Sequence, residues 1–437
     1  MPELIKDLEI TGLVHGGRGI GRCDGKAVFV PMTAPGDRVV CRVVRSKSSY
    51  SEAELVAVVE PSAHRREPPC PYFGSCGGCQ WQHLFYPSQC HWKEKIFFDQ
   101  LLRGKVVSQE CLVPIVPAPD EWHYRNRVQF KCHMTGKGLV TGFYRCGSHS
   151  VVEIKRCLLL PQQMQYVLDH LHKELPGAPC PECITQVDVA CGDDGALRVL
   201  LHGLTKGRRQ LQVWLQAFAQ RHQINACLQS GHRHTIELVH GETDLTVIVD
   251  QPPIAMGYGP GGFAQVNPAQ NRNLIAEVLA ILDLQGNEKV LDLFCGMGNF
   301  SLPIARRAGW VTGIEDHAPS VAAAINNAHV NNLKNVEFRV ADASTAISRG
   351  KYDDLDLLVL DPPRSGSYHA SREILKARPQ RVLYISCDPA TLVRDLQPLV
   401  HGGYRVVSSR PFDHFPQTWH VESMTLLERR SAVGCRT

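Results

Sequence analysis

Residues 290–301 read VLDLFCGMGNFS, and this stretch decides the fold of the C-terminal part of the chain. Its first half is an apolar run that predicts a buried strand, and Gly296 and Gly298 predict a loop that opens a helix. Similar runs recur downstream with amphipathic segments between them, which is typical of a doubly wound α/β domain. We expect its strands at residues 289–293, 311–315, 336–340, 355–360, 381–386 and 404–410.

The glycine loop is the expected ligand site, because open α/β sheets bind ligands at the carboxyl ends of their strands. A dinucleotide site would need a third glycine where this chain has Ser301. Asp292, four residues before Gly296, instead gives a loop that resembles the S-adenosylmethionine (SAM) loop of Rossmann-like methyltransferases. Glu315 ends the next strand, where it can accept both ribose hydroxyls, and Asp342 follows the third, where it can receive the adenine amino group. Each acid taken singly is equally compatible with a helix N-cap.

A cysteine and a carboxylate downstream of this loop indicate the chemistry. Cys387 directly follows the strand at 381–386, close to the donor pocket in such a topology. A thiolate that adds to carbon 6 of uracil turns the poorly nucleophilic carbon 5 into an enolate carbon that can take a methyl group. Glu422 suits the base that must then remove the carbon-5 proton. An ordinary thiol is only about 3% ionised at pH 7, so Cys387 needs an electropositive neighbour, for which Arg364 is the candidate.

Five motifs in fixed order resemble the RNA 5-methyluridine methyltransferase family. Methyltransferases of exocyclic amines have a similar site, but the fourth position of the corresponding motif is an aromatic residue that stacks on the base. This chain has Arg364 at that position, which disfavours amine methylation. The resemblance covers essentially the whole chain, with departures at Asp388, where Asn is common, and at His414, where Met or Leu is usual. The motifs are GGFAQVN at 261–267, the Asp292 loop, DPPR at 361–364, SCDPATLVRD at 386–395 and FPQTWHVE at 415–422.

The resemblance also implies a role for each matching residue. Cys387 becomes the nucleophile and Glu422 the base. The expected contacts to SAM come from Gln265, Phe294, Asn299, Glu315, Asp342 and Asp361.

The first sixty residues alternate short β-branched runs with turns rich in Gly and Pro, which predicts a small β-barrel. Strand candidates lie at 27–30, 38–44 and 54–59. The segment GIGRCDG at 19–25, with the VFVP and PGDRV that follow it, resembles a TRAM domain, an OB-like RNA-binding module. Eight basic and eight acidic residues balance over residues 1–62, which leaves a purely structural cap as the alternative.

The chain has 437 residues, more than one hydrophobic core usually supports. A proline-bearing polar stretch at 60–69 and the change of pattern after 251–253 mark two boundaries. We therefore expect an OB-like TRAM barrel at 1–62, an α+β central domain with an iron-sulfur site at 63–255, and a Rossmann-like SAM-dependent methyltransferase domain at 256–437. Neither a membrane-length apolar run nor a signal peptide is evident, so a cytoplasmic protein without membrane contact is expected.

The net charge of +4 names no partner, but its distribution does. Residues 121–160 carry seven basic and two acidic residues. Aromatic residues are interleaved among them, as in sites that bind single-stranded RNA through phosphates and unstacked bases. A solvated strand face with its aromatics in the core is the plain alternative. The aromatics are Trp122, Tyr124, Phe130, Phe143 and Tyr144.

Seventeen cysteines are many for a cytosolic chain, which points to metal-binding or catalytic thiols. Cys70, Cys76 and Cys79 supply three thiolates within ten residues, which suit zinc or an iron-sulfur cube equally. The family resemblance implies a [4Fe-4S] cluster with Cys157 as the fourth ligand. The family pattern leaves out a rival pair, at 180 and 183.

The barrel and the cluster cysteines together imply, within the family, a 23S rRNA uracil methyltransferase. A dual-site rRNA enzyme, or a tRNA enzyme of the same family, stays open. So do cytosine methylation and a catalytically silent RNA-binding assembly factor, although the intact Cys387 and Glu422 argue against a silent protein. We expect a flipped target base, because a stacked ring cannot present carbon 6, and a monomeric enzyme.

Overall fold

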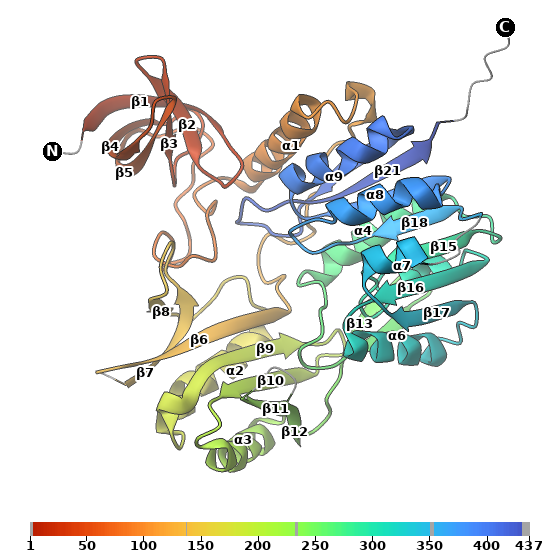
Figure 1. Ribbon diagram of the computed structural model, residues 1–437. Coiled ribbons are helices and arrows are strands. Elements are labelled where there is room, and N and C mark those ends of the chain that lie inside the picture. Colours follow the sequence, from red (N-terminus) through yellow and green to blue (C-terminus); the bar gives the residue numbers. More distant parts are fainter. Residues whose placement is uncertain (1–2, 137, 232–234, 350–353, 431–437) are drawn as a thin grey trace, which may run out of the picture.

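The structure is a computed structural model that describes residues 3–136, 138–231, 235–349 and 354–430. Figure 1 shows an N-terminal barrel, a central sheet with helices α2 (Gln162–Glu174) and α3 (Arg208–His222), and a C-terminal sheet with helices on both faces. Among the described residues, no helix is long and apolar enough to cross a membrane.

The N-terminal strands form a closed barrel in the order β1-β2-β3-β5-β4. Its interior is filled by alternating apolar residues such as Leu8, Ile10 and Val39. The turn between β1 and β2 passes through Gly16 and Gly17, whose φ angles of 90° and 82° favour glycine. The expected barrel is confirmed. Its strands are β1 (Leu4–Leu13), β2 (Gly19–Cys23), β3 (Lys26–Val30), β4 (Arg38–Ser46) and β5 (Tyr50–Glu60).

The central sheet has seven strands in the order β12-β11-β10-β9-β6-β7-β8. Only the β10–β11 pair is parallel, so this sheet is of the α+β kind. Helices α2 and α3 pack through Met164 and Leu215 onto alternate residues of β9 and β10. The strands are β6 (Arg127–Thr135), β7 (Gly138–Tyr144), β8 (Val151–Glu153), β9 (Ile184–Cys191), β10 (Leu197–Gly203), β11 (Asn225–Ser230) and β12 (Ile236–His240).

The C-terminal sheet has the order β17-β16-β15-β18-β19-β21-β20. Its first five strands are parallel, and β21 inserts antiparallel between β19 and β20. The doubly wound fold is confirmed, and the expected strands match β15 (Lys289–Leu293), β16 (Trp310–Glu315), β17 (Val336–Val340), β18 (Leu357–Leu360), β19 (Arg381–Ser386) and β20 (Tyr404–Phe412). The sequence did not predict β21 (Glu422–Arg429).

Helices cover both faces of this sheet and make two separate cores. One face carries α4 (Pro268–Leu282), α5 (Ser301–Ala305) and α6 (Ala318–Val330). The other carries α7 (Ala343–Arg349), α8 (Tyr368–Ala377) and α9 (Pro389–His401).

Helix α1 (Tyr86–Arg103) also belongs to this second core and lies beside α9 (Figure 1). Its Phe97 and Leu101 pack there with residues of α9 and β19. The hairpin of β13 (Leu245–Val249) and β14 (Ile254–Tyr258) packs on the opposite face, in the first core. Helix α1 and strand β13 lie before residue 256, and β14 crosses it, yet all three pack on the C-terminal sheet. The division of the chain at residues 62 and 255 stays a prediction.

Candidate active site

Cys387, Glu422 and Asp361 follow or open three neighbouring strands of the C-terminal sheet. Cys387 directly follows β19, and Glu422 is the first residue of β21. The register pairs Ser386 with Ser423, so one step further Cys387 stands opposite Glu422. Asp361 follows β18, which pairs with β19 on its other side. The fold therefore brings together the predicted nucleophile, the predicted base and one predicted SAM contact.

These three groups sit in a poorly hydrated site that favours their protonated forms. Burial, followed by the charges of Glu422 and Asp361, raises the pKa of Cys387 to about 12. Burial and Asp361 raise the pKa of Glu422 well above its usual range, and burial raises that of Asp361 to about 7. The neighbour expected for Cys387 is present, since Arg364 lowers its pKa, but burial outweighs that effect.

Arg364 is held over the site by aromatic side chains. Its guanidinium lies 5.4 Å from the ring centre of Trp419 and donates to Nδ1 of His420 at 3.1 Å. Trp419 and His420 contact each other with ring centres 4.0 Å apart. Burial, followed by the charge of Arg364, lowers the pKa of His420 to about 4, so its ring is neutral and can accept this hydrogen bond.

The glycine loop after β15 is anchored by buried acids. Ser301 Oγ donates to Asp292 Oδ2 at 2.5 Å, and the N–H of Gly296 donates to Glu315 at 3.1 Å. Phe294 begins the loop with a φ of 63°, in the left-handed region. Asp361 and Glu315 both act electrostatically on Asp292. Three of the acids noted in the sequence therefore gather around one loop.

Asp342 behaves as the alternative interpretation suggested. Its Oδ1 accepts hydrogen bonds from Ser344 Oγ at 2.6 Å and from the N–H of Thr345 at 2.9 Å, which caps α7. The bond from Ser344 and those from Thr345 lower the pKa of Asp342. A cap role and a ligand role do not exclude each other, because its second oxygen does not take part in these bonds.

Of the remaining two predicted SAM contacts, Asn299 lies in the loop itself and Gln265 lies just before α4. Asn299 and Asn271, from α4, exchange two amide hydrogen bonds of 2.8 and 3.1 Å. Gln265 is 9% exposed and lies in the segment that leads into α4. All six predicted contacts remain predictions.

A cavity of about 670 Å³ joins the candidate active site to the cysteine-rich segment. Cys387, Arg364 and His420 line it, and so do the four thiols of Cys70, Cys76, Cys79 and Cys157. The volume suits a nucleotide-sized ligand. Basic and aromatic residues complete the wall: Arg125, Arg127, Arg156, Phe143, Phe263 and Phe415.

The predicted RNA-binding stretch divides between this cavity and the core. Tyr124 and Phe130 are buried, at 7% and 0% exposure, so their expected role in stacking on bases is wrong and the core interpretation holds for them. Trp122 lies under the guanidinium of Arg66 at 5.4 Å, whereas Tyr144 is 40% exposed. Lys137, also counted in this stretch, lies outside the described residues.

The four predicted ligand cysteines line the same cavity. Burial and neighbouring thiols raise the pKa of Cys79 to about 12 and that of Cys157 to about 11. Of the residues that the structure describes, no three of these four sulfurs lie within 4.8 Å of one another. Tetrahedral zinc with bonds of about 2.3 Å would hold its sulfurs about 3.8 Å apart. The arrangement is wider than a single zinc ion requires.

Two further features of the cysteines were not predicted. Cys146 lies beside Cys76, since its N–H donates to the carbonyl of Ser75 at 3.3 Å and its thiol acts electrostatically on Cys76. Cys146 lies in the turn between β7 and β8, and nothing in the local sequence indicates that this turn lies beside Cys76. Cys180 and Cys183 are bonded to each other.

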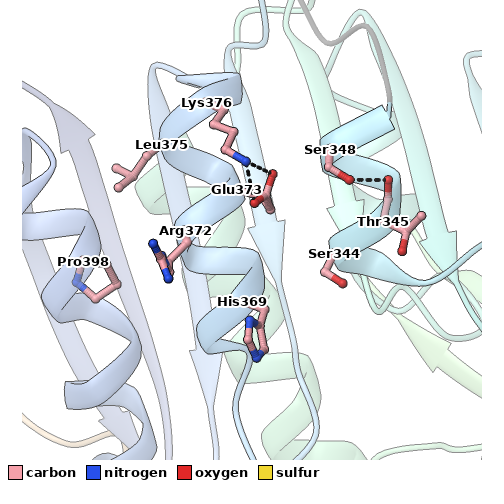
Figure 2. Close-up of a pocket in the computed structure, with 9 residues that line it drawn as sticks. All are labelled: Ser344, Thr345, Ser348, His369, Arg372, Glu373, Leu375, Lys376 and Pro398. Atoms are coloured by element: carbon pink, nitrogen blue, oxygen red, sulfur yellow. Dashed lines mark hydrogen bonds and ion pairs between the residues drawn. The ribbon is translucent and has the colours of Figure 1, made fainter.

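A second cavity, of about 700 Å³, lies between α7, α8 and α9. Figure 2 shows Glu373 and Lys376 of α8 paired with each other and Ser348 bonded to Thr345 of α7. None of the predicted site residues lines it. The candidate active site is therefore the first cavity with its adjoining loop.

The fold and the glycine loop define a Rossmann-like methyltransferase with an added RNA-binding barrel. The family model described as tRNA (uracil-5-)-methyltransferase matches residues 99–430, and that of the TRAM domain matches residues 5–56. The chain belongs to the tRNA (uracil-5-)-methyltransferase family, as the sequence motifs predicted.

Named relatives align over nearly the whole chain. The 23S rRNA (uracil(1939)-C(5))-methyltransferase RlmD of Alkalilimnicola ehrlichii is 36% identical and aligns over 99% of this chain and 98% of its own length. The protein of the same name from Shewanella woodyi is 33% identical over 96% of this chain and 95% of its own length.

One solved structure shares the overall architecture. The tRNA (uracil-54, C5)-methyltransferase of Pyrococcus abyssi, in complex with S-adenosyl-L-homocysteine, has a TM-score of 0.76 at 22% identity. The match covers 96% of this chain and all of that one. At this identity the likeness supports the fold alone.

Proposed function

We propose that this protein methylates carbon 5 of a uridine in 23S rRNA and takes the methyl group from SAM. The observation that carries the proposal is the juxtaposition of Cys387, Glu422 and Asp361 beside the glycine loop. Family membership supplies the reaction class, and the RlmD relatives supply the RNA.

Cys387 and Glu422 divide the chemistry between them. Once Cys387 has lost its proton to solvent, its thiolate forms a bond from Sγ to carbon 6, and the electrons of the C5=C6 double bond move to carbon 5 and the oxygen on carbon 4. Bound SAM supplies an electrophilic methyl group, which carbon 5 takes while S-adenosylhomocysteine leaves. Glu422 then accepts the carbon-5 proton, the double bond re-forms, and the bond to Sγ breaks.

The pKa values describe the resting site. Before ligands bind, the raised pKa values favour the protonated forms of Cys387, with a pKa of about 12, and of Glu422. Both groups must lose their protons before they can react. Arg364 favours the thiolate, and it stands close enough to Cys387 to act on it electrostatically. Positive charge brought to the site by a bound sulfonium would favour ionisation of the same groups.

The roles proposed for binding SAM follow from positions around the loop. Glu315 would accept the ribose hydroxyls, and Asp342 would receive the adenine amino group through its free oxygen. Gln265, Phe294, Asn299 and Asp361 would complete the pocket.

We also propose that Cys70, Cys76, Cys79 and Cys157 hold a [4Fe-4S] cluster. Their sulfurs converge on one cavity and are spaced more widely than a single zinc ion requires, which suits a larger inorganic core. Methyl transfer needs no electron, so the cluster would order the segments that carry the basic RNA-facing residues. A monomer in the cytoplasm is the setting that we propose for such an enzyme.

The decisive experiment is incubation with labelled SAM and unmodified 23S rRNA, followed by nuclease digestion and mass analysis. We expect one 5-methyluridine per rRNA from the wild-type protein and none from Cys387→Ala. Two modified positions, or methylation of tRNA, would indicate the related activities instead. No incorporation by the wild type would support a silent RNA-binding factor.

A trapping experiment tests the covalent step by itself. RNA substituted with 5-fluorouracil has no carbon-5 proton to lose, so the wild-type protein should stop as a covalent complex. Glu422→Gln should form a similar stable complex on ordinary RNA, because the adduct lacks its base. Complexes that survive denaturation only when Cys387 is present are the expected result.

A further inference from the structure

The loop between β1 and β2 of the barrel packs against residues 413–421, the segment between β20 and β21 that we call the catalytic loop. The carbonyl of Gly17 accepts a hydrogen bond from the indole Nε1–H of Trp81 at 2.9 Å. A Cβ atom on Gly17 would lie 2.9 Å from Cδ1 of Trp419. Leu13, Trp81 and Trp419 belong to one apolar cluster that joins the barrel to segments far along the chain. The barrel loop is therefore fitted closely to the segment that leads to Glu422.

His15 stands at the tip of this loop and contacts two groups of the candidate active site. Its ring meets Trp419 edge to face, with ring centres 4.7 Å apart. Its Nε2 lies 3.6 Å from Oδ2 of Asp388, slightly beyond hydrogen-bond distance. This nitrogen is buried and has no hydrogen-bond partner in the described structure. A slight movement of the His15 ring toward Asp388 would give this nitrogen a hydrogen-bond partner.

Both contacts of His15 lead to Cys387. Asp388 follows Cys387 directly, and its Oδ1 caps α9 by accepting from the N–H groups of Ala390 and Thr391 at 2.9 and 3.0 Å. Its Oδ2 is thereby left facing His15. Trp419, on the other side, carries the guanidinium of Arg364 over its ring. His15 thus contacts both the residue after the nucleophile and the platform of the cation beside it.

The charged groups that act on His15 are Asp388 and Arg364, and they oppose each other. Burial is the largest effect and lowers the pKa of His15, so the ring is neutral at pH 7. A neutral ring can donate its Nε2–H to the carboxylate while its face and edge pack on Trp419. The contact thus depends on ring packing against Trp419 and on close approach to Asp388, not on a pH switch.

We propose that His15 is a positioning residue for methyl transfer, through which the barrel completes the catalytic wall around Cys387. Through its contacts with Asp388 and Trp419, His15 fixes the position of the Cys387 thiol relative to the Arg364 guanidinium. This inference rests on the proposed function. It assigns the barrel a part in the chemistry in addition to RNA binding.

The test compares His15→Ala with His15→Gln, whose amide can still donate to Asp388. For each we would measure kcat, KM for RNA, and the rate at which iodoacetamide alkylates Cys387 without RNA, read by mass spectrometry of the residue 387 peptide. We expect His15→Ala to lower kcat by about ten- to a hundredfold with KM for RNA nearly unchanged. Alkylation should slow because Arg364 is less well placed, and His15→Gln should recover a substantial part of both.

His64→Ala is the matched control, because His64 is an exposed histidine that lies outside the candidate active site and bonds Ser88 of α1. It should behave like the wild type. Gly17→Ala should reproduce the loss of kcat, since its methyl group would push the loop from Trp419 while leaving the His15 side chain unchanged. This second variant keeps the proposal testable if His15→Ala folds poorly, and thermal melts would show which variants fold.

Loss confined to KM for RNA, or unchanged Cys387 alkylation in both folded variants, would overturn the proposal. Failure of the proposed function gives a different result. The wild-type protein would then methylate no RNA, whereas the alkylation rates would still report whether His15 controls the thiol.

Discussion

Asp292 shows how one buried side chain makes stability depend on pH. It is fully buried, and Oδ1 has no hydrogen-bond partner among the described residues. Burial, with Asp361 and Glu315 adding, raises its pKa to about 7. The folded state therefore holds this proton more tightly than the unfolded chain does. The stabilisation is complete below about pH 4 and is lost as the pH rises through 7.

Asp292→Asn should remove this dependence, since the amide resembles the protonated acid. Between about pH 4 and pH 8 we expect the variant to gain about 4 kcal/mol in unfolding free energy relative to the wild type, the equivalent of roughly three pKa units. Urea unfolding across this range would measure it. Asp120→Asn, at an exposed site, should show no such trend. A difference that stays constant with pH would contradict the expectation.

His414 is a second buried group with unmet polar atoms. Both ring nitrogens lack hydrogen-bond partners in the described structure, and the residue is 0% exposed. Burial, followed by Lys93, lowers its pKa to about 3. A group with a lowered pKa stabilises the fold less as the pH falls below the unfolded value of 6.5, because the unfolded chain binds the proton first.

His414→Met should therefore stabilise the protein by about 1–3 kcal/mol near pH 7, the cost of a buried unpaired polar group. The gain should grow by about 2 kcal/mol at pH 5. Denaturant unfolding at both values would test this, with His414→Gln, which keeps a polar group, as the matched comparison. Destabilisation by the Met variant would show that the ring has a partner.

At this scale the sequence predicted the reacting groups but not their state. Cys387 and Glu422 stand in recognisable motifs, and the fold brings them face to face. The protonation of Cys387 depends on burial among strands distant in sequence, and this outweighs the expected help from Arg364. His15 could not have been chosen, because nothing local in a barrel turn indicates a contact with residues 388 and 419.

At the scale of elements, β21 is the instructive omission. Its polar residues obscure a buried strand: Ser423 and Thr425 are almost fully buried. They are satisfied across the sheet, Ser423 by the carbonyl of Ser386 at 3.0 Å and Thr425 by Ser409 at 2.8 Å. The central parallel strands were predicted well because most of their residues are apolar, as in β18. A strand with internal hydrogen-bonded hydroxyls has no such pattern.

Helix α1 is fixed to the catalytic loop by a buried ion pair. Lys93 Nζ lies 2.6 Å from Asp413 Oδ1 and also donates to the carbonyl of Phe415, and both charged side chains are 0% exposed. A pair of this kind is expensive to break on one side, because the other charge is left buried. It thereby holds the segment before Trp419 in place.

Lys93→Met should destabilise the protein by about 3–5 kcal/mol, and adding Asp413→Leu should recover much of that loss. Unfolding free energies of the two single variants and the double variant form the required cycle. Lys95→Met, which removes an exposed pair on the same helix, should cost no more than about 1 kcal/mol. If the double variant is as unstable as Lys93→Met, the unpaired charge of Asp413 is not the cause of the instability.

For the whole molecule, the order of domains was predictable but their contacts were not. Composition and motifs located the barrel and the methyltransferase domain. The cavity that joins Cys387 to the cysteine segment arises from residues 70–82, 125–159, 263–266 and 364–420 together. Such long-range packing leaves no local pattern in the sequence. For the same reason, the packing of α1 on the C-terminal sheet could not be predicted.

The proposed cluster gives a prediction at this scale. Cys79→Ala and Cys157→Ala should each lose bound iron and acid-labile sulfide, because a thiolate ligand is missing. Cys146→Ser, which alters a thiol beside the group, should retain both. Anaerobic purification followed by iron and sulfide analysis would decide. Zinc in place of iron, or equal metal content in all three variants, would contradict the assignment.

The position of β21 has a consequence for biogenesis. It carries Glu422 and fills a gap between two strands that precede it in the chain. Translation proceeds from the N-terminus, so the barrel and the nucleophile's strand are made before β21. A chain folded only as far as β20 therefore holds the nucleophile without the carboxylate that stands opposite it.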